Sequence, residues 1–183
     1  MPGSDFSHQW TLLQEGAREV IAESPNNPAH VQLILNRLTA LLFGLDESLK
    51  QKATNSLDLI IQLVHSSIGT CTPTTITTVT DKNSSNANTN TNTSSTITND
   101  PHPESKPISL AALKAIKSCV IRNPVGRNAC RAAGVFEFLQ STLQHHSQDP
   151  ILLEEAMTTL AAMCLSNDLN ALQVSSVIGT DCP

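Results

Sequence analysis

Apolar residues recur at helical spacing in the first 66 positions of the 183-residue chain. The pattern predicts one helix over residues 6–23, ended by the Ser-Pro-Asn-Asn-Pro segment at 24–28, and a second over 28–43. The stretch 46–66 has a polar first half and an apolar second half, and Asp46 is a suitable N-cap residue. We therefore expect a short helix followed by a longer one in this stretch.

From Thr70 to Asn99 the chain is almost entirely Ser, Thr and Asn. Such a tract has too little apolar surface to offset the entropy lost on ordering, and its side chains bond their own backbone in coil. We therefore expect disorder over residues 68–106.

After the tract, apolar spacing predicts helices again, over residues 109–121, 124–133, 135–146 and 150–165. Ser109 and Asp149 are the expected N-caps of the first and last of these helices. Pro124 and Pro150 stand at first-turn positions, where the missing N–H of proline costs nothing. Gly134 is expected to make the turn between the two middle helices.

The segments 109–134 and 153–179 are similar at a nearly constant offset of 44 positions, so that Leu113 corresponds to Met157 and Asn123 to Asn167. A helical period of this length is typical of α-solenoids, in which each unit buries its apolar face on its neighbours. The expected fold class is therefore all-α, an α-solenoid interrupted by the Ser/Thr/Asn-rich tract.

Several short segments carry a family signature, at 123–124, 127–130, 134–139, 149–150 and 155–160. Together they resemble an armadillo repeat, whose unit has a short first helix, a glycine turn, a second helix and a long third helix. The resemblance covers residues 107–179. HEAT-type helical pairs share the period, so the subtype stays open.

The armadillo register can be extended backwards across the tract, because Leu38 then takes the same third-helix position as Ile116 and Leu160. The tract becomes an insertion in one interhelix loop, which costs little because closure entropy grows only logarithmically with length. The alternative is a linker between two small domains. The expected organisation is an N-terminal part of the repeat domain, an insertion and C-terminal repeats, at 1–67, 68–106 and 107–183.

In this register the chain starts with a second helix and stops just after a first helix. Exposed apolar faces at both ends of a solenoid predict a fragment, or a chain completed by another protein. The oligomeric state stays open.

The net charge of −5 argues against bulk attraction to nucleic acid or to an anionic membrane. The N-terminus has no signal-peptide pattern, and no stretch approaches the roughly 18 apolar residues of a membrane span. We expect a protein of the cytosol or the nucleus, with no membrane partner.

No motif for catalysis or cofactor binding stands out: there is no HExxH, no glycine-rich phosphate loop and no activated nucleophile. The five cysteines form no CxxC pair and are expected to be mainly buried thiols. His145 and His146 are adjacent, so that they point to different sides and are poorly placed to share a metal. We therefore expect no catalytic residue, no cofactor and no metal, and a protein that is not an enzyme.

A basic stretch holds six of the eleven Lys and Arg residues and no acid: Lys106, Lys114, Lys117, Arg122, Arg127 and Arg131. It could form a site for an acidic peptide, a phosphate group or RNA. It could equally be a solvated face whose side-chain stems cover apolar neighbours. No aromatic residues interleave these charges, which argues against nucleic acid as the partner.

The armadillo resemblance implies that the third helices line a groove that binds a protein or peptide partner. Importin-like members carry Trp and, four residues later, Asn in this groove. The matching pairs of this chain are Asn36 and Ala40, Lys114 and Ser118, and Thr158 and Ala162, which do not keep that pattern.

We therefore expect a non-catalytic interaction scaffold of armadillo type with generic groove binding. Its candidate groove residues are Asn36, Lys114, Lys117, Ser118 and Thr158. The alternative is a HEAT-like protein that associates with nucleic acid or phosphate through the basic stretch 106–131.

Overall fold

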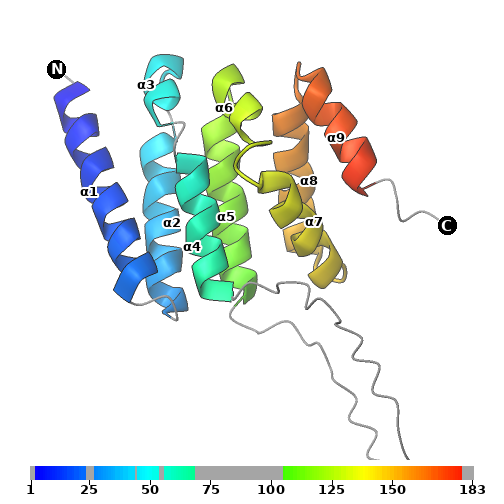
Figure 1. Ribbon diagram of the computed structural model, residues 1–183, viewed down its shortest axis with the longest axis horizontal. Helices are drawn as coiled ribbons and strands as arrows, with labels where there is room; N and C mark the ends of the chain where they lie inside the picture. The colour runs from blue at the N-terminus through cyan, green and yellow to red at the C-terminus, as the bar shows by residue number, and fades with distance from the viewer. Residues whose placement is uncertain (1–2, 24–26, 44, 54–55, 69–104, 179–183) are drawn as a thin grey trace, which may run out of the picture.

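A computed structural model describes residues 3–23, 27–43, 45–53, 56–68 and 105–178. Within these residues the chain forms nine helices and no strand, which confirms the all-α class (Figure 1). The predicted disorder lies outside the described residues except at Ile68, Ser105 and Lys106, and these three residues are helical.

The helices follow the predicted order. Their bounds are α1 Gly3–Glu23, α2 Pro28–Leu42, α3 Glu47–Lys52, α4 Ser56–Ile68, α5 Ser105–Val120, α6 Pro124–Ala129, α7 Val135–His145, α8 Pro150–Cys164 and α9 Asp168–Ile178.

Two predicted helix boundaries are wrong. Helix α5 begins at Ser105 rather than at Ser109, which lies buried inside the helix. The early start is possible because Pro107 falls in the first turn, where its missing N–H leaves no bond unmade. Helix α6 ends at Ala129 rather than near Ala133.

The predicted caps at Asp46 and Asp149 are confirmed. The Asp46 carboxylate accepts a hydrogen bond from the Leu49 N–H at 2.9 Å, and that of Asp149 accepts from the Ile151 N–H at 3.0 Å. Gly134 makes the predicted turn before α7, with a φ of +76° that favours glycine.

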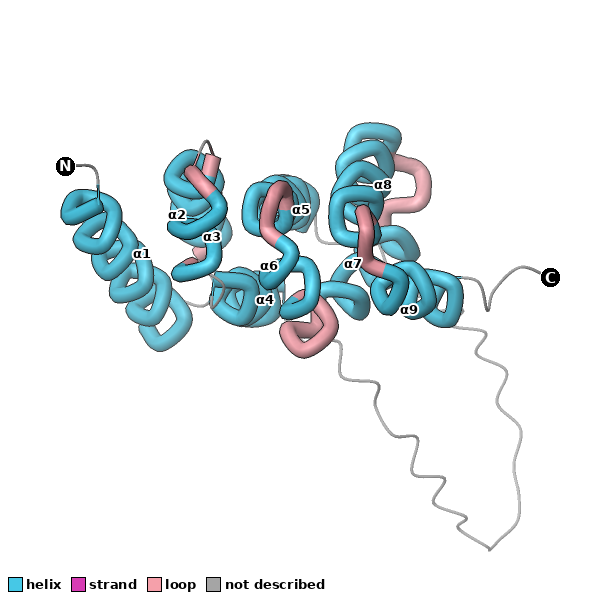
Figure 2. The backbone as a smooth tube through the Cα atoms, turned by 90° about the horizontal axis from the view of Figure 1, so that it is seen from above, coloured by secondary structure: helices cyan, strands magenta, loops and turns pink. Residues whose placement is uncertain are grey.

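The long helices α2, α5 and α8 lie side by side in one row, with α5 packed against both of the others (Figure 2). Helices α4 and α7 form a second row along one side of the first, and α1 packs on α2 and α4. The short helices α3 and α6 lie at the end of the rows where α2 and α5 stop (Figure 1). The core runs between the rows and includes Leu38, Ile116 and Leu160.

The corner after α5 is held by a buried basic side chain. The ammonium group of Lys50, in α3, donates to the Ile121 carbonyl at 3.0 Å. The amide of Asn123 donates to the Cys119 carbonyl at 2.9 Å and to the Lys50 carbonyl at 3.4 Å. These bonds tie the first turn of α6 to α3 and to the end of α5.

The corner after α8 repeats this arrangement with different residues. The Arg127 guanidinium of α6 donates to the Leu165 carbonyl. The Asn170 amide donates to the Met163 carbonyl at 2.8 Å and to the Arg127 carbonyl at 2.9 Å. The acceptors Cys119 and Ile121 correspond to Met163 and Leu165 at the offset of 44 found in the sequence.

Replacing Asn170 with alanine is expected to lower the free energy of unfolding by about 1–3 kcal/mol, because two buried carbonyls lose their donor. Urea denaturation followed by circular dichroism measures the loss. The control is Asn36→Ala on the exposed side of α2, which should stay within about 0.5 kcal/mol of the parent. Equal effects of the two substitutions would show that the corner bonds add nothing.

Candidate partner-binding surface

Helices α2, α5 and α8 present three rows of equivalent residues on their shared exposed side. The first row is polar and exposed: Asn36, Lys114 and Thr158. The second row has small side chains: Ala40, Ser118 and Ala162. The third row is apolar and exposed: Phe43, Ile121 and Leu165. We call these nine residues the α2–α5–α8 surface.

The three large apolar side chains of the third row are exposed to solvent. Phe43, Ile121 and Leu165 are 80%, 43% and 65% exposed, and each directly follows one of the three long helices. Phe43 and Leu165 are the C-cap residues of α2 and α8, and both have extended ψ values, of 123° and 113°. Arg122 and Ser166, the residues after Ile121 and Leu165, both have positive φ, so the chain leaves α5 and α8 in the same way.

Lys117 is placed between α5 and α8. Its ammonium group forms an ion pair with the Glu155 carboxylate and donates to the Thr158 hydroxyl at 3.3 Å. The two charged side chains are 28% and 15% exposed, respectively. Lys117 therefore joins two helices, and its charge is already compensated within the fold.

Most of the other predicted basic residues also have partners in the protein. Lys106 forms an ion pair with Asp149. Arg127 is only 9% exposed and holds the corner after α8, where the Arg131 guanidinium bonds the side-chain oxygen of Asn170.

Lys114 and Arg122 differ from these four. Both are exposed, and neither side chain has a hydrogen bond or ion pair among the residues that the structure describes. Lys114 lies in the first row of the α2–α5–α8 surface, and Arg122 directly follows its third row. The free positive charge of the basic stretch is therefore concentrated beside this surface.

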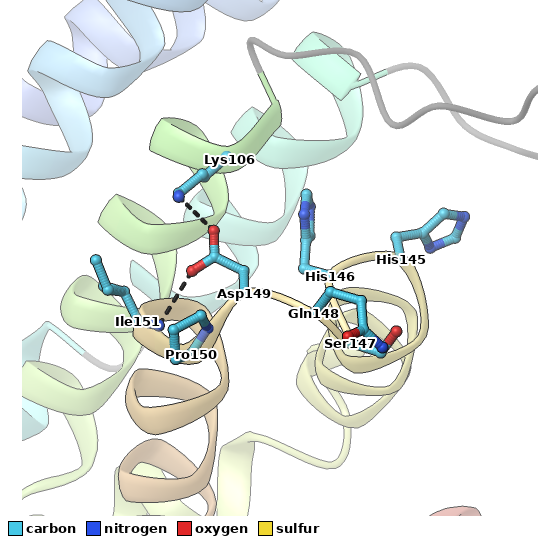
Figure 3. A pocket seen from close by; sticks show the side chains of 8 residues that line it. All are labelled: Lys106, His145, His146, Ser147, Gln148, Asp149, Pro150 and Ile151. Carbon is cyan, nitrogen blue, oxygen red and sulfur yellow. Dashed lines mark hydrogen bonds and ion pairs between the residues drawn. The ribbon is translucent and has the colours of Figure 1, made fainter.

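A shallow cavity of about 520 Å³ lies where the turn between α7 and α8 meets the start of α5 (Figure 3). Lys106 and Asp149 line it as an ion pair, and the His146 ring lies beside them while His145 points away from them. The His146 ring lies 3.5 Å from the Ser105 hydroxyl, whereas that of His145 lies 2.7 Å from the Ser141 carbonyl. The two imidazoles have different partners, and the described residues include no group of three metal-ligating side chains.

Burial and hydrogen bonds shift the pKa values of His146 and Asp149 in this cavity. Burial is the main cause that lowers the pKa of His146 below 6.5. The charge of His145 lowers this pKa further, the charge of Asp149 raises it, and the charge of Lys106 lowers it. The hydrogen bond from Lys106, followed by that from the Leu152 N–H, lowers the pKa of Asp149 below its ordinary value. Near neutral pH the cavity therefore holds a Lys–Asp pair beside an uncharged imidazole.

The three cysteines of the described segments are not activated as nucleophiles, because burial raises the pKa of each thiol. Burial raises the pKa of Cys119 to about 11 and that of Cys130 to about 12, so both thiols stay protonated at neutral pH. Burial also raises the pKa of Cys164, which is half-buried. The prediction of buried thiols therefore holds for Cys119 and Cys130 and in part for Cys164, while positions 71 and 182 lie outside the described residues.

In comparisons with protein-family models, curated proteins and solved structures, nothing matches the chain. The armadillo resemblance thus rests on the sequence pattern. None of the described helices is long and apolar enough to cross a membrane.

The structure brings the predicted groove residues of α5 and α8 together, since Lys114, Lys117 and Ser118 share α5 and Lys117 contacts Thr158. Asn36 lies on the neighbouring helix α2. Sequence reasoning missed the third row. Its signal was present in the numbering, because Phe43, Ile121 and Leu165 are separated by 78 and 44 positions, the same offsets that relate Leu38, Ile116 and Leu160.

Protonation of His146 is expected to destabilise the fold. Its pKa is lower in the folded chain than in the unfolded chain, so the unfolded state binds more protons between the folded value and about 6.5. The free energy of unfolding should therefore rise with pH through this window and reach its full value above it.

Urea denaturation at a series of pH values tests this dependence. His146→Gln should flatten the slope, whereas His8→Gln, an exposed control on α1, should leave it as in the parent. A slope that persists in His146→Gln would assign the effect to another group.

Proposed function

We propose that this chain is a non-catalytic scaffold of armadillo type, an α-solenoid that binds a partner protein or peptide on the α2–α5–α8 surface, in the cytosol or nucleus. The observation that carries the proposal is the third row, where three adjacent helices expose a large apolar side chain at the same position. Exposed apolar patches mark interaction sites in soluble proteins, and these three side chains stand at equivalent positions after neighbouring helices.

The repeated corners support the solenoid part of this proposal. Helices α3, α4 and α5 are followed by α6, α7 and α8 in the same order of short, medium and long elements. Lys50 and Arg127 donate to equivalent main-chain carbonyls, and Asn123 and Asn170 tie each corner to the preceding short helix. A stack that grows by repeating one contact is what distinguishes a solenoid from a single-core helical domain.

The second row supports contact with a polypeptide. Ala40, Ser118 and Ala162 leave little side-chain volume between the polar and apolar rows. A partner backbone can approach the helices closely there, with its side chains reaching the rows on either side.

The alternative is association with nucleic acid or phosphate through the basic stretch. Such binding requires several free cations. Its affinity comes from the counterions that leave the nucleic acid when Lys and Arg side chains neutralise its phosphates. Lys106, Lys117, Arg127 and Arg131 are already paired or bonded, which leaves Lys114 and Arg122. This distribution favours the protein partner.

Charge reversal at Lys114 is expected to weaken binding of a natural partner at least tenfold, while the melting temperature stays unchanged because the side chain is exposed. The partner is first identified by affinity capture and mass spectrometry, and its affinity is then measured with the purified protein. Arg18→Glu, an exposed cation of α1 away from the surface, is the matched control.

A Lys114→Glu variant that melts lower yet keeps its partner would contradict the proposed surface. Binding of RNA with a steep salt dependence would favour the alternative.

A further inference from the structure

The spacing of the third row sets a condition on the partner, if the proposed function is correct. Phe43, Ile121 and Leu165, the apolar ridge, directly follow α2, α5 and α8, three neighbouring helices of one row. Packed helices lie about 8–10 Å apart. A partner that contacts the whole ridge therefore needs side chains on one side that repeat at about that distance.

Regular backbones differ in how they meet this condition. A polyproline-II segment has three residues per turn and rises about 3.1 Å per residue, so every third side chain returns to the same side after about 9 Å. Same-side residues of a β-strand repeat after about 7 Å or 13 Å. An α-helix returns after seven residues and about 10.5 Å, but it is itself about 10–12 Å wide.

A polyproline-II segment and an α-helix both fit the spacing, and the second row favours the thinner one, the polyproline-II segment. Ala40, Ser118 and Ala162 form a strip of small residues directly beside the ridge. An extended backbone can lie on such a strip, whereas a helix would be held away from it by its own side chains.

The charges beside the ridge give the second condition. Arg122 follows the central ridge residue Ile121, is exposed and has no ion pair within the described segments. Lys114 adds a second free cation on the same helix surface, and none of the nine residues of the surface is acidic. A carboxylate in the partner beside its central apolar residue would pair with Arg122.

We propose that the α2–α5–α8 surface binds a polyproline-II segment that carries an apolar side chain at every third position and an acidic residue beside the middle one. The apolar side chains lie along Phe43, Ile121 and Leu165, and the carboxylate meets Arg122. The segment backbone lies on the small residues of the second row.

Three synthetic peptides of equal length and composition test the spacing. Each has three leucines, prolines and a central glutamate, and the leucines are placed at every third, every second or every seventh position. Fluorescence anisotropy titrations with the full chain should give a dissociation constant at least tenfold lower for the every-third peptide. Equal affinities, tighter binding of either other spacing, or no binding by any peptide would overturn the proposal.

Two variants test the contacts with the every-third peptide. Phe43→Ser should weaken its binding at least tenfold, and Leu12→Ser, which removes an apolar side chain of α1 that is 54% exposed, should not. Arg122→Glu should weaken binding of the glutamate peptide and have little effect on a glutamine version. Loss of binding with Leu12→Ser as well, or no loss with Phe43→Ser, would show that the peptide does not use the ridge.

The outcome is separable from that of the proposed function. If the captured natural partner is lost with Lys114→Glu while the every-third peptide fails to bind, the scaffold function stands and the polyproline-II segment is excluded. If the peptide binds through the ridge while Lys114→Glu leaves the captured partner bound, that partner uses another surface.

Discussion

Hydrogen bonds from buried side chains to main-chain carbonyls hold the chain where it leaves α5 and α8. At the first corner Lys50 supplies the cation, and burial lowers its pKa. At the second corner the guanidinium of Arg127 has the same role. The asparagine amides then satisfy the carbonyls at the helix ends, which would otherwise be buried without donors. These corners hold the C-terminal ends of α5 and α8, where the third row of the surface follows each helix.

The helices themselves could be predicted from the sequence because helical periodicity and caps are local signals. Asp46, Asp149 and Gly134 act where the pattern placed them. The start of α5 could not be fixed in this way, since Ser105 and Ser109 are equally suitable caps and Pro107 is compatible with either start. The choice follows from packing: Ser105 and Ile108 are both buried against the rest of the chain.

The candidate site was predicted in part. The repeat register placed Asn36, Lys114 and Thr158 on one side of the long helices, and all three are exposed. The basic residues are close together along the chain but do not form one surface in the fold. Arg127 and Arg131 form hydrogen bonds at the corner after α8, whereas Lys114 and Arg122 are exposed to solvent. The acceptor of Arg127 is a main-chain carbonyl, which every residue possesses. No pattern of side chains in the sequence can therefore point to this bond.

Ile121 and Leu165 serve two purposes through different atoms: their carbonyls hold the corners, and their side chains form part of the ridge. A substitution at either position changes the ridge but leaves the acceptor in place, provided that the new residue keeps the backbone angles. The side chains of the surface can therefore change while the hydrogen bonds of the corners stay in place. Related chains built on the same corners could therefore change the residue that follows each long helix without changing the corner itself.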